Sequence, residues 1–250
     1  MSVTSEVSYR PGRKAEYAAK MFPAIARPYD RLTHWLTFFL DRQWRARAAE
    51  SAAVAAGHRV LDLATGTGEL ALALARRVGP NGRVVGVDLT RAMLVEARRK
   101  IAGTPSERAI TLIELDASRS LPFPDESFHA ATMGLALRYF DVPVTIAEMA
   151  RVVKPGGRVV ILDFAIPTRW WAKPGYWLWA FGLMPLLGGI LARDRQVYNL
   201  LHFLPRSVSH FHDPATIEQI MRAAGLSNVR AEPLTLGITT LFVGIKLPHL

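Results

Sequence analysis

LDLATGTGEL, residues 61–70, is the stretch that decides the fold of this chain. An apolar run leads into a turn that carries Gly66 and Gly68, and a helical pattern follows the turn. This order of strand, glycine turn and helix is typical of nucleotide-binding α/β proteins, although the third glycine of a G-x-G-x-x-G pattern is absent. Asp62 and Glu69 flank the turn, so the ligand must be one that tolerates acids there.

Outward from this stretch, short apolar runs alternate with helix-like segments. Continuous apolar strands between helices are typical of a parallel sheet buried on both faces. The segment KPGG, residues 154–157, is expected to be a turn, and a helix capped by Asp213 and ended by Gly225 precedes the last two strands. We therefore predict a doubly wound, mostly parallel, seven-stranded α/β sheet of the Rossmann-like type. The expected strands are 59–64, 83–88, 110–116, 128–135, 157–164, 227–234 and 237–247.

The rest of the chain divides around this sheet. The expected parts are an N-terminal tail with lid helices over 1–56, the core over 57–167, a Trp-rich cap over 168–213, and a C-terminal helix and strand pair over 214–250. Within the cap, the apolar run 176–192 is short for crossing a bilayer and is interrupted by proline and glycine. The run is either a hydrophobic cover or homodimer contact, or part of a membrane surface at residues 170–192.

Composition and charge narrow the function further. Lys and Arg number 31 against 21 Asp and Glu, a net charge of +10 that attracts anionic partners. The basic residues are spread along the chain without interleaved aromatics, so we expect no nucleic-acid partner. The absence of cysteine excludes disulfides, thiolate metal sites and a cysteine nucleophile. Residues 1–14 lack the apolar core of a secretory signal, and we expect a cytoplasmic protein, peripheral at the inner face of the membrane if the cap binds lipid.

The acids at the strand ends select the cofactor. Asp88 lies 20 residues beyond Gly68, where a carboxylate can accept both ribose hydroxyls of a dinucleotide or of S-adenosylmethionine. Acids beside the turn would repel a pyrophosphate, whereas they suit the sulfonium and ammonium groups of S-adenosylmethionine. Asp116 ends the next strand and can accept from the adenine amino group, with the amide of Ala117 beside it. Each acid alone could be a helix cap or solvated, but three successive strand ends favour the methyl donor.

Several motifs in order carry a resemblance to a known family. LDLATGTGEL, VVGVD, ELDASRSLPFPDESF and RVVKPGGRVVILDF resemble the successive motifs of class I S-adenosylmethionine-dependent methyltransferases. A more specific similarity, over about residues 20–165 and 196–246, is to the ubiquinone and menaquinone biosynthesis C-methyltransferases. The segments that carry it are IARPYDRLTHWLTFFLDRQWR, SLPFPDESFHAAT with ALR, and FHDPATIEQIMRAAGLSNVRAEPLTLGITTLFVGIK. The resemblance implies a lipophilic aromatic or quinone substrate.

The resemblance also implies where the cofactor binds. In that family the cofactor is held at positions matching Thr67, Asp88, the pair Asp116 and Ala117, and Gly134. Family members usually have serine in place of Gly134 and asparagine in place of Asp116, so these two contacts differ here. With the rest of the turn and the flanking residues, the expected cofactor-binding set is Asp62, Ala64, Gly66, Thr67, Gly68, Asp88, Leu89, Asp116, Ala117 and Gly134.

The catalytic residues are expected in the segment LALRY, residues 135–139, which stands where the family has FGLRN. The resemblance implies that Arg138 helps to remove a ring proton, and Tyr139 replaces the usual asparagine. Tyr139, His34 and Tyr29 are further candidates for proton transfer. Packing on a helix face would explain His34 and Tyr29 equally well.

These residues favour C-methylation of a demethylated quinone. Two alternatives stay open: an O-, N- or C-methyltransferase of secondary metabolism, and a non-catalytic nucleic-acid-binding protein of the same fold. No metal is expected, because His202, His210 and His212 lack a recognisable ligand spacing.

Overall fold

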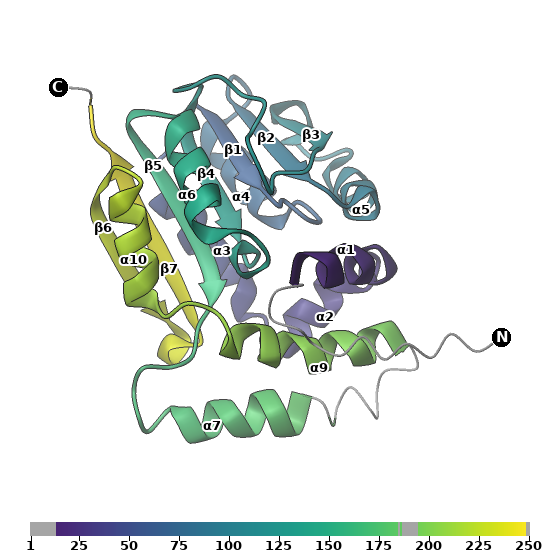
Figure 1. Ribbon diagram of the computed structural model, residues 1–250. Helices are drawn as coiled ribbons and strands as arrows, with labels where there is room; N and C mark the ends of the chain where they lie inside the picture. The colour runs from purple at the N-terminus through teal and green to yellow at the C-terminus, as the bar shows by residue number, and fades with distance from the viewer. Residues whose placement is uncertain (1–13, 185, 187–194, 249–250) are drawn as a thin grey trace.

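The computed structural model describes residues 14–184, 186 and 195–248, which fold around one seven-stranded sheet (Figure 1). Its strands coincide with the apolar runs of the sequence. They are β1 (Arg59–Leu63), β2 (Arg83–Asp88), β3 (Ile110–Glu114), β4 (Phe128–Gly134), β5 (Val153–Phe164), β6 (Leu226–Leu234) and β7 (Thr239–Lys246).

The strand order is β3-β2-β1-β4-β5-β7-β6. The pairs from β3 to β5 are all parallel, and β7 lies antiparallel between β5 and β6. The chain winds outward from β1 to β3 and then returns to place β4 on the other side of β1, so the topology reverses between β1 and β4. The predicted doubly wound, mostly parallel sheet is confirmed, and a crevice at the carboxyl ends of β1 and β4 is where such sheets bind ligands.

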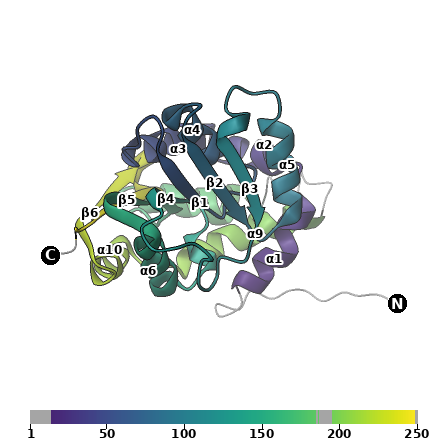
Figure 2. The ribbon, with the colours of Figure 1, turned by 90° about the horizontal axis from the view of Figure 1, so that it is seen from above.

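Helices cover both faces of the sheet and its carboxyl edge. Their bounds are α1 (Lys14–Ile25), α2 (Tyr29–Leu36), α3 (Leu40–Ser51), α4 (Glu69–Val78), α5 (Arg91–Ile101), η2 (Glu107–Ala109), η3 (Leu137–Tyr139), α6 (Val142–Val152), α7 (Lys173–Trp177), η4 (Leu178–Leu183), α9 (Arg195–Ser209), α10 (Pro214–Ala223) and η5 (Thr235–Gly237). Figure 2 shows the sheet between two layers, with α3 and α4 on one side and α6 and α10 on the other. Helices α1, α2, α7 and α9 lie beyond the carboxyl ends of the parallel strands (Figure 1).

Local sequence signals set the ends of the helices on the second face. Asp213 caps α10 as predicted, because its side chain accepts a hydrogen bond from the N–H of Thr216 over 3.0 Å. Gly225 follows α10 with a φ of 83°, the left-handed conformation that glycine adopts without strain. Asp141 caps α6 in the same way by accepting from Val144. These caps fix where each helix turns back toward the sheet.

Among the differences between expected and observed strand boundaries, two change the interpretation. β3 ends at Glu114, so Asp116 lies in the loop after the strand and not at its end. β5 begins at Val153, and the predicted turn at 154–157 lies inside it. The pairing jumps from Phe128 with Val153 to Ala130 with Arg158, so the extra residues form a bulge. The glycine-rich segment is therefore an irregularity of the strand and not its start.

Part of the predicted tail and cap lies outside the described residues. This holds for 1–13 and, within the apolar run 176–192, for 185 and 187–192. The described part of the cap consists of α7, the π-helical turn η4 and α9. No helix in the described parts of the chain is long and apolar enough to cross a bilayer.

Candidate active site

The glycine turn after β1 joins a backbone amide to a carboxylate. Gly66 has a φ of 56°, and its N–H donates to Oδ2 of Asp88 over 2.8 Å. Gly68, with a φ of 80°, begins α4, and a Cβ at this position would lie 3.3 Å from Cβ of Ala97 on α5. The structure thus places Gly66 beside the ligand crevice, and it gives Gly68 the role of letting α4 and α5 pack closely.

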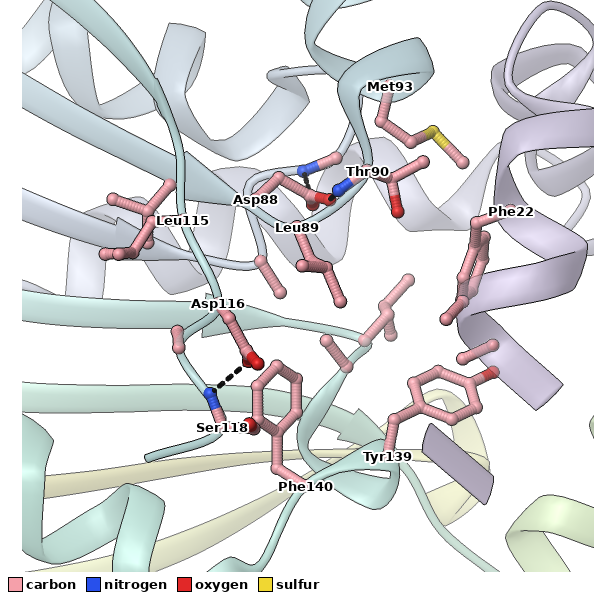
Figure 3. A pocket seen from close by; sticks show the side chains of 18 of the residues that line it. Phe22, Asp88, Leu89, Thr90, Met93, Leu115, Asp116, Ser118, Tyr139 and Phe140 are labelled. Atoms are coloured by element: carbon pink, nitrogen blue, oxygen red, sulfur yellow. Dashed lines mark hydrogen bonds between the residues drawn. The ribbon is translucent and has the colours of Figure 1, made fainter. Parts of the chain in front are cut away.

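A cavity of about 130 Å³ lies at the carboxyl ends of β1, β2 and β4, between the sheet and α1 (Figure 3). Asp88 stands at its edge and accepts from the amides of Gly66 and Thr90, the latter over 2.7 Å. Burial raises the pKa of the Asp88 carboxyl, and the two amides oppose that shift. We call this space the adenosine cavity, after the ligand group that the sequence leads us to expect there. Seven predicted cofactor residues line it: Ala64, Gly66, Asp88, Leu89, Asp116, Ala117 and Gly134.

Asp116 stands at the opposite rim of the adenosine cavity, close to the ring of Phe140 (Figure 3). Its carboxylate accepts from the N–H of Ser118 over 2.9 Å, and hydrogen bonds from Ser118 lower the pKa of Asp116. An ionised carboxylate at this rim can accept a hydrogen bond from an exocyclic amine. The apolar side chains of Leu89, Met93 and Phe140 supply flat walls for a base.

A smaller, polar cavity of about 40 Å³ adjoins the first on the other side of the turn. We call it the polar cavity. Its acid Asp62 is buried and accepts from the hydroxyls of Thr65 and Thr132 over 2.6 and 2.7 Å. Burial raises the pKa of Asp62 to about 6, against the effect of these hydroxyls. Thr67 also lines this cavity and donates to Asp30 over 2.5 Å.

The other acid beside the turn, Glu69, is paired. Lys100 of α5 lies 2.6 Å from Oε1 of Glu69 and also pairs with Asp30 of α2. Two carboxylates therefore share one ammonium, so the charge of Lys100 offsets that of the added acid Asp30, and the turn stays about as negative as Asp62 and Glu69 indicated. The repulsion expected toward a pyrophosphate is retained.

Arg138 and Tyr139 meet in a third cavity, of about 30 Å³, which we call the reaction cavity. The guanidinium of Arg138 is 4 % exposed and donates to Asp163, to the carbonyl oxygen of Leu135 and to the hydroxyl of Tyr139. Its Nε has no hydrogen-bond partner among the described residues. Burial disfavours the charge, but Asp163 raises the pKa of Arg138 above its ordinary value. Arg138 is a permanent cation there.

Two tyrosines line the reaction cavity, and both are neutral at ordinary pH. Burial raises the pKa of Tyr139 to about 12, and burial likewise raises the pKa of Tyr29. Tyr29 also lines the adenosine and polar cavities, so it stands where all three meet. A neutral phenol can donate a hydrogen bond but is a poor base, which limits the proton-transfer role considered for both residues.

The fourth predicted catalytic residue, His34, lies elsewhere. Its Nδ1 is 2.8 Å from Oδ2 of Asp41, and its ring stacks on Phe39 at 5.8 Å. It lines none of the cavities named above. His34 therefore joins α2 to α3, as the packing interpretation expected.

An apolar chamber of about 370 Å³ adjoins the reaction cavity. The two spaces share Leu36, Thr37, Phe164 and Leu204. Aromatic side chains from α3, the end of β5 and the cap line the chamber, namely Trp44, Phe164, Trp171, Tyr176 and Trp179. The adenosine cavity, the reaction cavity and the apolar chamber are therefore neighbours in that order.

The sequence did not single out several of these residues. Asp163 is not among the site residues expected from the sequence, yet it holds Arg138 from 25 positions away. Arg45, Lys100 and Asp30 come from three different helices and converge on the turn only in the folded chain. No spacing rule links such residues. For metal binding, the described residues contain no group of three or more His, Cys, Asp or Glu side chains placed to hold an ion.

Known proteins resemble this chain in sequence over nearly its whole length. Residues 11–246 match the ubiE/COQ5 methyltransferase family. The chain is 36% identical over 239 residues to the ubiquinone/menaquinone biosynthesis C-methyltransferase UbiE of Geobacter sulfurreducens, covering 95% of this chain and 91% of that protein. It is 41% identical to the demethylmenaquinone methyltransferase of Thermus thermophilus, covering 90% and 99%.

Solved structures share the fold at low sequence identity. A SAM-dependent methyltransferase from Aquifex aeolicus matches with a TM-score of 0.56 at 15% identity, over 96% of this chain and 100% of that one. A Haemonchus contortus phosphoethanolamine N-methyltransferase in complex with S-adenosyl-L-methionine matches with a TM-score of 0.55 at 17% identity, over 80% and 51%. These likenesses support the Rossmann-like methyltransferase fold.

The cavities suit the methyl donor chemically. Asp88 with its two amides fits a ribose, Asp116 and the apolar walls fit adenine, and the polar cavity fits an amino-acid end. The chain is an S-adenosylmethionine-dependent methyltransferase and belongs to the ubiE/COQ5 methyltransferase family.

Proposed function

We propose that the chain methylates a ring carbon of a demethylated quinone in its reduced form, and that this substrate carries an apolar prenyl tail. The observation that carries the proposal is the apolar chamber, which adjoins the cavity of Arg138 and Tyr139 and is large enough for several isoprene-like carbons. The relatives named above as ubiquinone/menaquinone and demethylmenaquinone methyltransferases support the same class of substrate.

The residues of the reaction cavity would act mainly by alignment and charge. When bound, S-adenosylmethionine supplies an electrophilic methyl group. Arg138, held by Asp163, can stabilise the negative charge on a ring oxygen and so make the neighbouring carbon nucleophilic.

The ring carbon loses its proton as the new carbon–carbon bond forms. Arg138 is already protonated and cannot accept this proton. Burial alone would lower its pKa, but Asp163 outweighs burial and raises the pKa above the ordinary value. Tyr139 and Tyr29 are neutral and donate instead. The proton therefore leaves through a water that Arg138 and Tyr139 orient, and the side chains serve as donors around it.

The test uses purified protein with S-adenosylmethionine and two acceptors. Reduced demethylmenaquinone should yield a ring-methylated product, and a soluble phenol without a tail should be methylated far more slowly. Mass spectrometry of the product locates the methyl group. Efficient methylation of the soluble phenol, with none of the quinol, would overturn the proposal.

A methyltransferase of secondary metabolism is the second candidate, and Tyr139 is the observation that favours it. Tyr139 packs edge-on against Phe22 at 5.6 Å and stacks on Phe203 at 6.0 Å, so it narrows the reaction cavity where the family usually has asparagine. A panel of phenols, amines and quinols, compared by kcat/KM, separates the two candidates.

The chamber rim supports a further proposal, that the protein binds the membrane surface. Phe38 and Trp171 line the chamber and are 68% and 49% exposed. Trp170 and Leu178 beside them are 81% and 72% exposed. Arg169 lies over the ring of Trp171 at 5.8 Å, which adds positive charge to this apolar rim. Exposed aromatics next to arginines suit an anionic lipid interface.

Vesicle binding tests this surface. The wild type should cosediment with vesicles that contain phosphatidylglycerol better than with phosphatidylcholine alone, and the double variant W170S/L178S should lose several-fold of that binding. V144S on α6, where Val144 is 44% exposed, is the matched control. A wild type that ignores vesicles but dissociates from dimer to monomer in the double variant would assign the surface to a homodimer and overturn the membrane proposal.

A further inference from the structure

Arg45 is a buried cation in the wall of the polar cavity. It lies on α3, is 8% exposed, and lines the cavity together with Tyr29 and Asp62. Arginine is rarely buried without a charged partner. The hydrogen-bond partners of the N–H groups of Arg45 therefore decide what this residue can do. Arg45 is far from the glycine turn in sequence, and no motif singled it out.

One side of Arg45 is held by α3 and α2. Its Nη1 donates to Asp41 one helical turn away, and Asp41 also accepts from Thr37 over 2.9 Å and contacts His34 at 2.8 Å. Burial raises the pKa of Asp41, but Arg45, His34 and Thr37 outweigh it and hold the pKa below its ordinary value. Asp41 is thus an ionised anchor that fixes the direction of the guanidinium.

The guanidinium of Arg45 has further N–H donors on the side that faces away from Asp41. In the described part of the chain, its hydrogen bonds engage Nη1 alone. A guanidinium carries five N–H donors in a planar fork that matches a carboxylate. Because Arg45 lines the polar cavity, the remaining donors are available to an anion bound there.

The polar cavity carries charges of both signs. Arg45 supplies the positive charge, and Asp62 and Glu69 supply carboxylates nearer the turn. Lys100 partly neutralises Glu69, while the hydrogen bonds that Asp62 accepts from described residues come from hydroxyls alone. A ligand group with an ammonium and a carboxylate on one carbon complements this arrangement.

We propose that Arg45 binds the α-carboxylate at the methionine end of S-adenosylmethionine. The inference concerns the cofactor and does not depend on the quinone substrate. The cavity that contains Arg45 shares Tyr29, Ala64, Gly66 and Gly134 with the adenosine cavity, so one extended ligand can occupy both. Arg45 would distinguish a complete amino-acid end from one that lacks its carboxylate.

The test compares the equilibrium binding of S-adenosylmethionine with that of its decarboxylated analogue, by calorimetry and without any methyl acceptor. The wild type should bind the complete cofactor about 10- to 100-fold more tightly, the range expected for one charge-assisted bidentate contact. R45Q should bind both ligands with similar affinity, and R45K should recover part of the preference. R47Q is the matched control, because Arg47 lies on the same helix and pairs at the surface with Glu50 and Glu232.

Three results would overturn the inference: equal binding of the two ligands by the wild type, a preserved preference in R45Q, or the same loss of preference in R47Q. The first needs no variant, so a misfolded R45Q does not protect the proposal. Failure to methylate a quinol would leave the binding ratio unchanged, which separates this test from that of the proposed function.

Discussion

Nη2 of Arg138 donates a hydrogen bond to the hydroxyl oxygen of Tyr139 over 2.8 Å, within a cavity that both side chains line. The hydroxyl of Tyr139 accepts from Arg138 and thereby keeps its own proton free to donate. The two neighbours in sequence form one donor unit, which Asp163 anchors from β5.

Replacing Arg138 with lysine should remove the fixed arrangement of N–H donors in this unit. R138K keeps the positive charge but loses the planar fork, so we expect kcat to fall by about 10²- to 10³-fold, the range for the loss of one donor that stabilises developing charge. The Kd for S-adenosylmethionine should stay within the error of the wild type. Radiolabelled methyl transfer measures the first and calorimetry the second, with R222K on the surface of α10 as the control. Wild-type turnover in R138K would contradict the assignment.

Y139F tests the hydroxyl alone. We expect kcat to fall by about 10-fold, because one neutral hydrogen-bond donor is lost. Since burial raises the pKa of Tyr139 to about 12, the hydroxyl stays protonated at lower pH, and the pH–rate profiles of wild type and Y139F should have the same shape from about pH 7 to 10. A limb that disappears in Y139F within that range would show that Tyr139 titrates during turnover.

Asp88 should dominate the affinity for the ribose. D88A removes a carboxylate that holds two backbone amides and faces the adenosine cavity, so we expect the Kd for S-adenosylmethionine to rise by at least about 10-fold. Thermal shift with S-adenosylmethionine and with NAD, on wild type and D88A, measures this. D125A, which alters an exposed acid, should behave as the wild type does. Stabilisation of the wild type by NAD as strong as that by S-adenosylmethionine would refute the cofactor geometry.

Asp62 gives a prediction about pH and stability. Burial raises its folded-state pKa from 3.8 to about 6, so the folded state holds the proton more tightly than the unfolded state does. The stability that this provides is complete below about pH 4 and is lost as the pH rises through about 6. The melting temperature of D62N relative to the wild type should therefore increase between pH 4 and 7, as measured by circular dichroism without ligand. A difference that is constant across this range would disprove the buried, protonated state.

The apolar chamber predicts a dependence on tail length. Ala180 is 2% exposed and lines the chamber, so A180F should fill part of it. KM should rise several-fold for a quinol with a long prenyl tail and stay unchanged for a tailless one. A102F, at an exposed position after α5, controls for the added ring. Equal effects on both substrates would show that the chamber does not hold the tail.

The sheet could be predicted from the sequence because its signals are local. Each parallel strand is a short apolar run, and the cap at Asp213 and the glycine at Gly225 act within a few residues. The bulge in β5 escaped prediction because KPGG has the composition of a turn, and only pairing with β4 shows that the strand continues through it.

The candidate site was predictable only in part. Residues at or just beyond strand ends, such as Asp88 and Asp116, follow from topology, because parallel strands deliver their carboxyl ends to one edge. The partners that set their chemistry do not. Asp163 reaches Arg138, and Arg45 reaches the polar cavity, through tertiary packing that no sequence spacing encodes. His34 looked like a proton carrier in the sequence because its partner, Asp41, could not be identified there.

The adenosine cavity and the apolar chamber are bordered by different kinds of exposed side chain. Leu89, 53% exposed, stands at the adenosine cavity, whereas Phe38 and Trp171 surround the apolar chamber near the cap. If the rim binds lipid as proposed, a spent nucleoside can leave toward water while the rim stays at the membrane surface. The enzyme could then carry out successive turnovers on one vesicle without leaving its surface. It would diffuse along the leaflet from one quinol to the next.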